Sequence, residues 1–295
     1  MPIGVDFGGT RIKAGRVEDG RVKSHAVVNT PRDPAAVLDA IAALVKELEA
    51  EPGSLGLCIP GEVNERGECW RLPNVPGFDG MNIARELMKR LGCPVAVEND
   101  ATAAALAERM YGHGLRERSF LLVTLGTGTG GGLCLDGTVR RGRHGFAGEI
   151  GHVLVDSASS AWPCGCGARG CMESYAGTAG ILRKYHERGG QGHDVEAVAR
   201  SARQGDSAGV EALAMAGRAL GLGLGSIQNT LDLDAVVFSG GVSASFDLIR
   251  PAIEAALKDR AFAPPLAQVK LLVSALGNDA GIIGATLLPQ VTLNE

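Results

Sequence analysis

The residue types most capable of chemistry gather in one short segment. Cys164, Cys166 and Cys171 lie within eight residues, and His152 stands twelve residues before the first of them. Three thiols and one imidazole suit a closed tetrahedral zinc site. The C-x-C-x₄-C spacing differs from the usual C-x₂-C of zinc fingers, so three free thiols in a loop are the alternative. Glycines between the cysteines favour the metal site, because a loop that supplies several ligands must fold back on itself.

Carboxylates flank this segment and also occur earlier in the chain. Glu149 precedes it and Glu173 follows it, so a zinc-held loop would fix both carboxylates toward one pocket. The tripeptide Glu98-Asn-Asp100 stands where a short strand is expected to pass into an Ala-rich helix, which is where ligands bind in open α/β sheets. Asn or Asp before a helix is also a typical N-cap. The tripeptide therefore indicates either a helix cap or a catalytic carboxylate.

Glycine makes up 43 of the 295 residues, about twice its usual share. It concentrates in turns at residues 8–9, 126–132 and 240–241. Glycine lets backbone N–H groups approach an anion closely, so all three turns are compatible with phosphate. Asp6, beside the first turn, would hold magnesium through water, and Lys13 would add a positive charge. Tight β-turns with an Asp turn residue are the alternative interpretation.

The run Gly126-Thr-Gly-Thr-Gly-Gly131 also fits the dinucleotide fingerprint G-x-G-x-x-G. That fingerprint must open a helix after its strand. Here a second strand and an Asp136-Gly137 hairpin turn follow instead, so we do not expect a Rossmann site. The sequence contains neither a Walker-type G-x-x-x-x-G-K-[ST] loop nor the set of protein-kinase motifs.

Composition and charge exclude several classes of protein. The formal charge is −4 and no strong basic block stands out, which argues against nucleic acid as a partner. Asp6 interrupts the first apolar run, so we expect no signal peptide, and no apolar stretch reaches the roughly 18 residues of a membrane helix. Seven cysteines, an odd number, indicate a reducing compartment rather than a disulfide framework. We therefore expect a cytoplasmic protein.

The elements that position these residues occur in two similar series. Residues 3–28 are typical of a strand, a Gly-rich turn, a strand, an Asp-Gly turn and a strand, and residues 120–137 repeat most of that order. Such an internal repeat indicates two related α/β halves with a cleft between them. Further helices are expected over residues 34–51, 101–110, 208–230 and 279–288, and buried strands over 55–59, 95–97 and 235–238.

Taken together, these motifs resemble those of the ROK (repressor, open reading frame, kinase) sugar kinases, which have the actin-like, sugar-kinase and heat-shock ATPase fold. The matching segments fall in the family order and span nearly the whole chain. They are Asp6-Phe-Gly-Gly-Thr-Arg-Ile-Lys13, Glu98-Asn-Asp-Ala101, Leu125-Gly-Thr-Gly-Thr-Gly-Gly-Gly132, Gly148-Glu-Ile-Gly-His152, Cys164-Gly-Cys-Gly-Ala-Arg-Gly-Cys-Met-Glu173 and Ser239-Gly-Gly241. The resemblance implies an α/β protein with a duplicated actin-like/sugar-kinase (ribonuclease H-like) fold, two domains and a central cleft.

The resemblance also implies a domain plan and an activity. We expect a small N-terminal α/β domain over residues 1–111, a large C-terminal α/β domain with the zinc loop over 112–278, and a C-terminal helix over 279–295 that packs back on the N-terminal domain. The implied reaction is ATP-dependent phosphorylation of the 6-hydroxyl of a hexose. Glucose is the first choice, and N-acetylglucosamine, N-acetylmannosamine and fructose are the alternatives. A homo-oligomer, dimer or tetramer, is implied as well, with neither nucleic acid nor membrane as a partner.

Individual roles carry over from the family at matching positions. Asp100 resembles the general base, and the resemblance places magnesium near Asp6. The residues that resemble sugar ligands are Gly61, Asn74, Asn99, Asp100, Glu149, His152 and Glu173. Those that resemble ATP ligands are Asp6, Gly8, Gly9, Thr10 and Lys13 in the first phosphate loop, Thr127, Gly128, Thr129 and Gly130 in the second, and Gly240 and Gly241 beside the adenosine. Those that resemble ligands of a structural zinc ion are His152, Cys164, Cys166 and Cys171.

The chain departs from the family pattern at two places. Thr102 stands where the family often has Asn, and the stretch from His152 to Cys164 is a little longer than usual. The rival of a different class is a sugar-responsive repressor, which should carry a helix-turn-helix of about 60 to 80 residues before the first phosphate loop. Only five residues precede Asp6, which disfavours this reading. A catalytically dead sugar-binding protein and a kinase that uses polyphosphate are further rivals, although the zinc cluster and Gly240-Gly241 favour ATP.

Overall fold

The computed structural model describes residues 2–64, 66–73 and 75–291. The contacts divide the chain into two compact units. The first unit consists of Met1–Ser119, Gly132–Gly148 and Ala275–Glu295, and the second consists of Phe120–Gly131 and Glu149–Ser274. Residues from the C-terminal helix therefore belong with the N-terminal part of the chain, and so does the segment 132–148. The predicted domain limits after residues 111 and 278 stay a prediction.

The first unit is built on a mixed five-stranded sheet in the order β3-β2-β1-β4-β7. Its strands are β1 (Pro2–Phe7), β2 (Arg11–Glu18), β3 (Arg21–Asn29), β4 (Ser54–Ile59) and β7 (Val95–Asn99). The first three form an antiparallel meander, and β4 and β7 run parallel to β1. The turn between β2 and β3 is the predicted Asp-Gly turn, with φ of 51° at Asp19 and 71° at Gly20. A small sheet of β5 (Glu62–Val63) and β6 (Cys69–Arg71) follows β4.

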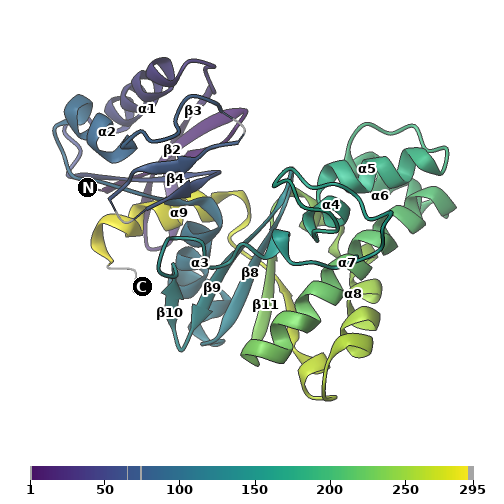
Figure 1. Cartoon of the computed structure of the whole chain (residues 1–295). Coiled ribbons are helices and arrows are strands. Elements are labelled where there is room, and N and C mark those ends of the chain that lie inside the picture. The colour runs from purple at the N-terminus through teal and green to yellow at the C-terminus, as the bar shows by residue number, and fades with distance from the viewer. Residues whose placement is uncertain (1, 65, 74, 292–295) are drawn as a thin grey trace. The chain divides into compact units, whose positions relative to one another are not determined.

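Helices cover both faces of this first sheet (Figure 1). On one side lies α1 (Pro34–Leu48), which begins at an Asp33 N-cap and buries Val37, Ile41 and Val45 at helical spacing. Beside it packs α2 (Ile83–Leu91), and α9 (Ala280–Leu287) packs on β1 and β4 from the other side. Against α9 lies α3 (Asp100–Tyr111), which follows β7 directly. The short helices of this unit are η1 (His113–Leu115), η5 (Gly277–Asp279) and η6 (Leu288–Gln290).

Two glycines let α9 approach its neighbours closely. A Cβ atom added at Gly56 of β4 would overlap the Ala285 carbonyl, and one added at Gly284 would overlap the Ala103 carbonyl of α3. Part of the glycine excess therefore serves helix packing, a use that the turn motifs in the sequence did not indicate.

The second sheet repeats the plan of the first. Its strands are β8 (Phe120–Leu125), β9 (Thr129–Leu135), β10 (Thr138–Arg140), β11 (Ala235–Ser239) and β12 (Lys270–Val273). Their order is β10-β9-β8-β11-β12, with β10 antiparallel to β9, and with β8 and β12 parallel to β11. The equivalent hairpin turn again has positive φ, 54° at Asp136 and 80° at Gly137. The predicted duplication is confirmed at the level of strand order.

The helices of the second unit gather around its longest one. They are α4 (Glu173–Ala176), α5 (Thr178–Glu187), α6 (Val195–Arg203), α7 (Ser207–Leu231), α8 (Phe246–Arg260), and the short η2 (Ile150–His152), η3 (Gly241–Ser245) and η4 (Leu266–Gln268). Among the described residues, α7 alone is long and apolar enough to span a membrane, but 56% of that apolar window is buried inside the protein. It packs against α4, α5, α6 and α8, as a core helix does (Figure 1). Glycines 217 and 221 lie against backbone carbonyls of α8, which shows close helix packing there.

Candidate active site and metal centre

Asp6 lies near the carboxyl end of β1, directly before the first Gly-rich turn. It pairs across the meander with Lys13, whose Nζ is 3.5 Å from Asp6 Oδ2. Burial raises the pKa of Asp6, and the positive charge of Lys13 opposes that shift. The turn is closed by a hydrogen bond from the Gly8 N–H to the Arg11 carbonyl at 2.9 Å. A cation beside Asp6 would offset the cost of its desolvated charge.

The predicted phosphate residues Gly9 and Thr10 lie exposed in the same turn. The Thr10 carbonyl accepts a hydrogen bond from the Thr30 N–H at 2.9 Å, and the Thr30 hydroxyl donates to the Gly8 carbonyl at 2.7 Å. The start of β2 and the end of β3 therefore hold this turn in place, while Gly9 and Thr10 remain exposed.

Cys58 is a residue of this site that the sequence did not single out. It pairs with Asp6 in the β1–β4 register and with Glu98 in the β4–β7 register. Its Sγ is 3.7 Å from Asp6 Oδ1 and 3.6 Å from the Gly281 carbonyl oxygen. Burial, together with the nearby charges of Asp6 and Asp100, raises the pKa of this thiol well above its usual range, so it stays protonated. The one signal in the sequence is its place at the end of a buried strand.

Asn99 and Asp100 stand at the junction of β7 and α3. Asn99 is the N-cap, because its Oδ1 accepts hydrogen bonds from the N–H groups of Ala101 and Thr102 at 2.9 and 3.1 Å. Its amide nitrogen donates to the Gly61 carbonyl at 3.2 Å. Asp100 is half-buried in the first turn of α3, and its Oδ1 accepts a hydrogen bond from the Ala101 N–H at 2.7 Å. Capping of α3 therefore falls to Asn99, with Asp100 directly after it.

Glu98 precedes these two residues and forms a buried ion pair. Its Oε2 is 2.5 Å from Arg141 Nε, and its Oε1 accepts a hydrogen bond from the Asn99 N–H at 2.8 Å. Burial raises the pKa of Glu98, and Arg141 opposes that shift. Nothing in the sequence connects Arg141, which follows the β9–β10 hairpin, with the end of β7. Tertiary structure alone brings the two together.

The second Gly-rich turn joins β8 to β9 and does not open a helix, which agrees with the exclusion of a Rossmann site. The Gly126 N–H donates to the Gly128 carbonyl at 3.0 Å, and Thr178 donates its N–H and its hydroxyl to the Gly126 carbonyl at 3.0 and 2.8 Å. Glu173 Oε2 accepts a hydrogen bond from the Thr129 N–H at 3.0 Å. A predicted sugar ligand therefore contacts the predicted second phosphate loop. Thr127 lies at the tip of this turn, and Gly130 continues β9.

The turn after β11 requires glycine at one position. Gly240 has φ of 89°, and a Cβ atom there would overlap the Leu125 carbonyl at the end of β8. Gly241 then begins η3, with open space where a Cβ atom would lie. The carboxyl ends of β8 and β11 therefore carry two Gly-rich turns side by side, as their parallel pairing requires.

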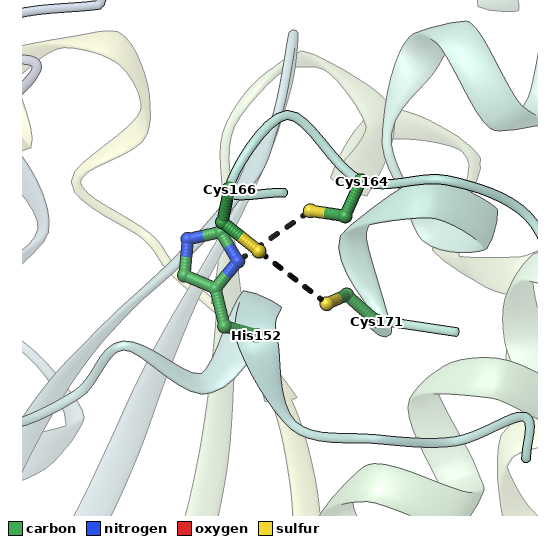
Figure 2. A group of neighbouring side chains, drawn as sticks. All are labelled: His152, Cys164, Cys166 and Cys171. Carbon is green, nitrogen blue, oxygen red and sulfur yellow. Dashed lines mark hydrogen bonds between the residues drawn. The ribbon is translucent and has the colours of Figure 1, made fainter. Parts of the chain in front are cut away.

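The side chains of His152, Cys164, Cys166 and Cys171 point toward one another (Figure 2). Their ligand atoms all lie within 4.8 Å of one another, with Cys164 Sγ 3.6 Å from His152 Nδ1 and Cys166 Sγ 3.8 Å from Cys171 Sγ. All seven cysteines are free. Burial and the neighbouring thiols raise the pKa of Cys171 to about 12, and a dication at the centre would favour its thiolate. The donor set fits a tetrahedral zinc ion.

Both flanking carboxylates lie beside this cluster. Glu149 Oε2 is 3.8 Å from His152 Nε2, on the opposite ring nitrogen from the thiols. Glu173 Oε1 is 3.9 Å from Cys164 Sγ. Glu149 and Glu173 therefore both lie beside residues of the cluster in the second unit, as carboxylates that orient metal ligands often do. Asn74 lies outside the described residues.

The longer stretch after His152 is anchored by aromatic packing that the sequence did not indicate. Trp162 stacks on Tyr175 with ring centroids 4.8 Å apart, and the Arg183 guanidinium lies 4.0 Å over the Trp162 ring. The Tyr175 hydroxyl donates to Asp156 at 2.6 Å and accepts from the Trp162 N–H at 2.9 Å. The extra residues therefore pack on α4 and α5, close in sequence to Cys164.

The two similar α/β units define the actin-like, sugar-kinase class of fold. The chain matches the ROK family over residues 2–291, and it belongs to that family. It is 34% identical over 309 residues to the glucokinase of Streptomyces coelicolor, covering 97% of this chain and 96% of that one. It is 31% identical over 303 residues to the N-acetyl-D-glucosamine kinase of Pasteurella multocida, covering 98% and 99%.

A solved structure supports the same assignment of fold. The crystal structure of a ROK family glucokinase from Streptomyces griseus, in complex with glucose and AMPPNP, matches this chain with a TM-score of 0.85 and 33% sequence identity. The match covers 98% of this chain and 99% of that chain. The predicted family and fold class are therefore confirmed.

Proposed function

We propose that the protein transfers the terminal phosphoryl group of ATP to the 6-hydroxyl of a hexose, with glucose as the first candidate. The observation that carries the proposal is the group of Asp6, Cys58 and Asp100 at the ends of adjoining strands. One carboxylate there suits a magnesium ion and the other a substrate hydroxyl. Similarity along the whole chain to glucokinases supports the same activity.

Asp100 is the proposed general base. Its carboxylate accepts the proton of the sugar hydroxyl and aims the oxygen at the phosphorus. Asn99 caps α3 and thereby fixes the backbone position of Asp100. The side-chain amide of Asn99 is proposed to lie on the sugar side of the site. The Gly61 carbonyl accepts a hydrogen bond from that amide, and Gly61 and Asn74 are proposed as further contacts of the sugar.

ATP is proposed to lie on the Gly-rich turns. The turn of Gly8, Gly9 and Thr10, with Lys13, is proposed to contact the phosphate chain, and so is the turn of residues 127–130. Gly240 and Gly241 leave room for the adenosine. Magnesium, bound near Asp6 through water, would neutralise the charge that develops on the phosphate oxygens.

The second unit is proposed to supply both sugar contacts and a structural zinc ion. Glu149, His152 and Glu173 would bind sugar hydroxyls and hold the sugar in an attacking geometry. Zinc would be held by the His152 imidazole and the three thiols of the cluster, and by closing the loop it would fix the positions of Glu149 and Glu173.

A second candidate substrate is N-acetylglucosamine, because the chain is nearly as similar to an N-acetyl-D-glucosamine kinase as to a glucokinase. The test is an ADP-release assay with ATP over a panel of hexoses and N-acetylhexosamines, with inorganic polyphosphate as a second donor. We expect glucose to give the highest kcat/KM. ADP release with none of the sugars would overturn the proposed function, and specific operator binding in a gel-shift assay would favour the repressor.

We also propose that the protein is a cytoplasmic homo-oligomer, dimer or tetramer. Seven free cysteines support a reducing compartment. Light scattering after size-exclusion chromatography tests the oligomer, because a chain of 30.4 kDa would give about twice or four times that mass.

A further inference from the structure

We infer that Glu98 and Arg141 form a positioning pair that holds the general-base segment against the sugar-side loops. This inference rests on the proposed function. Both side chains are buried, with exposures of 3% for Glu98 and 12% for Arg141, and neither has an assigned part in the chemistry.

Glu98 connects the pair to the base segment. Its two carboxylate oxygens are used in different directions: Oε2 faces Arg141, and Oε1 accepts the hydrogen bond from the Asn99 N–H. Asn99 caps α3 and donates to the Gly61 carbonyl, and Asp100 follows it. Any displacement of Glu98 is therefore transmitted to the backbone that carries Asn99 and Asp100.

Arg141 connects the pair to two further loops. Its Nη2 donates to the Val63 carbonyl at 3.2 Å, in the small sheet that follows Gly61. Its own carbonyl accepts a hydrogen bond from the Ala147 N–H at 2.9 Å, which closes the segment 141–148. That segment leads directly into Glu149 in the sequence. The guanidinium of Arg141 thus links the base segment to the loop after Gly61, and the backbone carbonyl of the same residue holds the loop before Glu149.

Two further contacts hold the segment 141–148 against the small sheet. Gly145, with φ of 85°, lies so close to the Val63 carbonyl that a Cβ atom there would be 2.7 Å from it. Phe146 packs edge-on against Trp70 of β6, with ring centroids 5.2 Å apart. The ion pair is therefore the buried end of a larger interface rather than an isolated contact.

The chemistry of the pair suits positioning more than stability. Burying two charges costs desolvation energy that their attraction only partly offsets, so such a pair adds little net stability over apolar residues. Arginine presents several donors in a fixed planar fork, so it can meet a carboxylate and a carbonyl at once, whereas lysine offers a single point charge. The charge contact with Glu98 and the hydrogen bond from Nη2 to the Val63 carbonyl together hold the Arg141 side chain in place.

The test compares Arg141→Met, Arg141→Lys, Glu98→Gln and the double variant Glu98→Gln/Arg141→Met in the full-length protein. For each we would measure kcat, the KM for glucose, the KM for ATP and the urea midpoint. We expect kcat/KM for glucose to fall about 10²-fold in Arg141→Met, because small misplacements of reacting groups cost that much. The KM for ATP should change little, and Arg141→Lys should be intermediate.

The double variant separates positioning from folding. It leaves no unpaired buried charge, so it should regain stability lost by Arg141→Met, yet its kcat/KM for glucose should stay low. Arg109→Met is the matched control, because Arg109 lies in the same unit and donates to the Gly137 and Gly114 carbonyls at 2.8 and 3.4 Å. We expect normal glucose kinetics from the folded control.

Wild-type kcat/KM for glucose in Arg141→Met, or a loss that the double variant recovers along with its stability, would overturn the positioning role alone. A wild-type chain that phosphorylates no sugar of the panel would instead overturn the proposed function and this inference with it.

Discussion

At the scale of single residues, the junction of β7 and α3 shows how one tripeptide serves two purposes. The pattern Glu98-Asn-Asp100 left a cap and a catalytic carboxylate as alternatives, and the structure gives the cap to Asn99. The residue types at this junction could be read from the sequence. The partner of Glu98 could not, because Arg141 follows a hairpin 43 positions later and only folding brings it near.

The first prediction concerns the base. Asp100→Asn should fold normally, since the amide oxygen of Asn can accept the hydrogen bond that Asp100 Oδ1 takes from the Ala101 N–H at 2.7 Å. It should bind glucose but lose about 10²–10⁴-fold in kcat, the usual contribution of a general base. Steady-state kinetics and a thermal melt measure the two effects.

Asp33→Asn provides the control, because Asp33 is also a carboxylate at a helix N-terminus and Asn caps equally well. Its kcat should be that of the wild type. If Asp100→Asn also kept near-normal turnover, another group would have to accept the proton.

The second prediction concerns Glu173, which contacts both the cysteine cluster and the second phosphate loop. Glu173→Ala removes the acceptor of the Thr129 N–H, so we expect the KM for ATP to rise as well as the KM for glucose. Hydrogen bonds to charged groups contribute about 1.5–3 kcal/mol, which corresponds to a rise of about tenfold or more. Glu149→Ala, whose carboxylate lies beside His152 Nε2 at 3.8 Å, should raise only the KM for glucose. Equal KM values for ATP in the two variants would contradict the prediction.

At the scale of elements, glycine proved to have two uses. The turn glycines could be located from the sequence, because positive φ and Asp-Gly hairpins have recognisable patterns. The glycines under α9 and along α7 could not be assigned, since a glycine within a strand or helix does not reveal which neighbour approaches it. The stacking of Trp162 on Tyr175 could not be predicted from the sequence either, because it depends on how a loop packs on α4 and α5.

The third prediction tests close packing. Gly284→Ala should lower the free energy of unfolding by about 1–3 kcal/mol, the usual cost of overpacking, because the added methyl group would overlap the Ala103 carbonyl. Urea denaturation measures the change. Gly165→Ala is the control, because nothing lies near its added Cβ and its φ is not positive. An unchanged urea midpoint in Gly284→Ala would show that α9 can move away without cost.

The fourth prediction tests the zinc loop. Cys166→Ser should lower the zinc content of the purified protein below one ion per chain, since the thiolate is the stronger ligand. The KM for glucose should rise, because Glu173 lies beside Cys164 and loses its fixed position when the loop opens. Elemental analysis and kinetics measure both effects, and removal of zinc with a chelator should reproduce the second.

Cys93→Ser is the matched control, because Cys93 is a free thiol of the first unit outside the cluster. It should keep its zinc. Full zinc content in Cys166→Ser would exclude Cys166 as a ligand.

At the scale of the whole molecule, the duplicated strand order was predictable because both series begin with the same Gly-turn meander. The grouping of segment 132–148 with the first unit was not, because it depends on tertiary contacts. Arg109 of α3 reaches the Gly137 carbonyl, and Gly132 lies against the Ala101 carbonyl. The order of strands and turns in the sequence therefore indicates the internal repeat, while tertiary contacts determine where each unit ends.

The fifth prediction concerns the choice of sugar and belongs to the whole chain, since any ligand that binds only the folded state stabilises all of it. Glucose at about one hundred times its Kd should raise the free energy of unfolding by about 2.7 kcal/mol. N-acetylglucosamine at the same concentration should stabilise less if glucose is the substrate. The Asp100→Asn variant should still be stabilised by glucose, because it loses the base and keeps the other groups proposed to bind the sugar. Greater stabilisation by N-acetylglucosamine would make the N-acetylhexosamine the substrate and leave the phosphoryl-transfer mechanism intact.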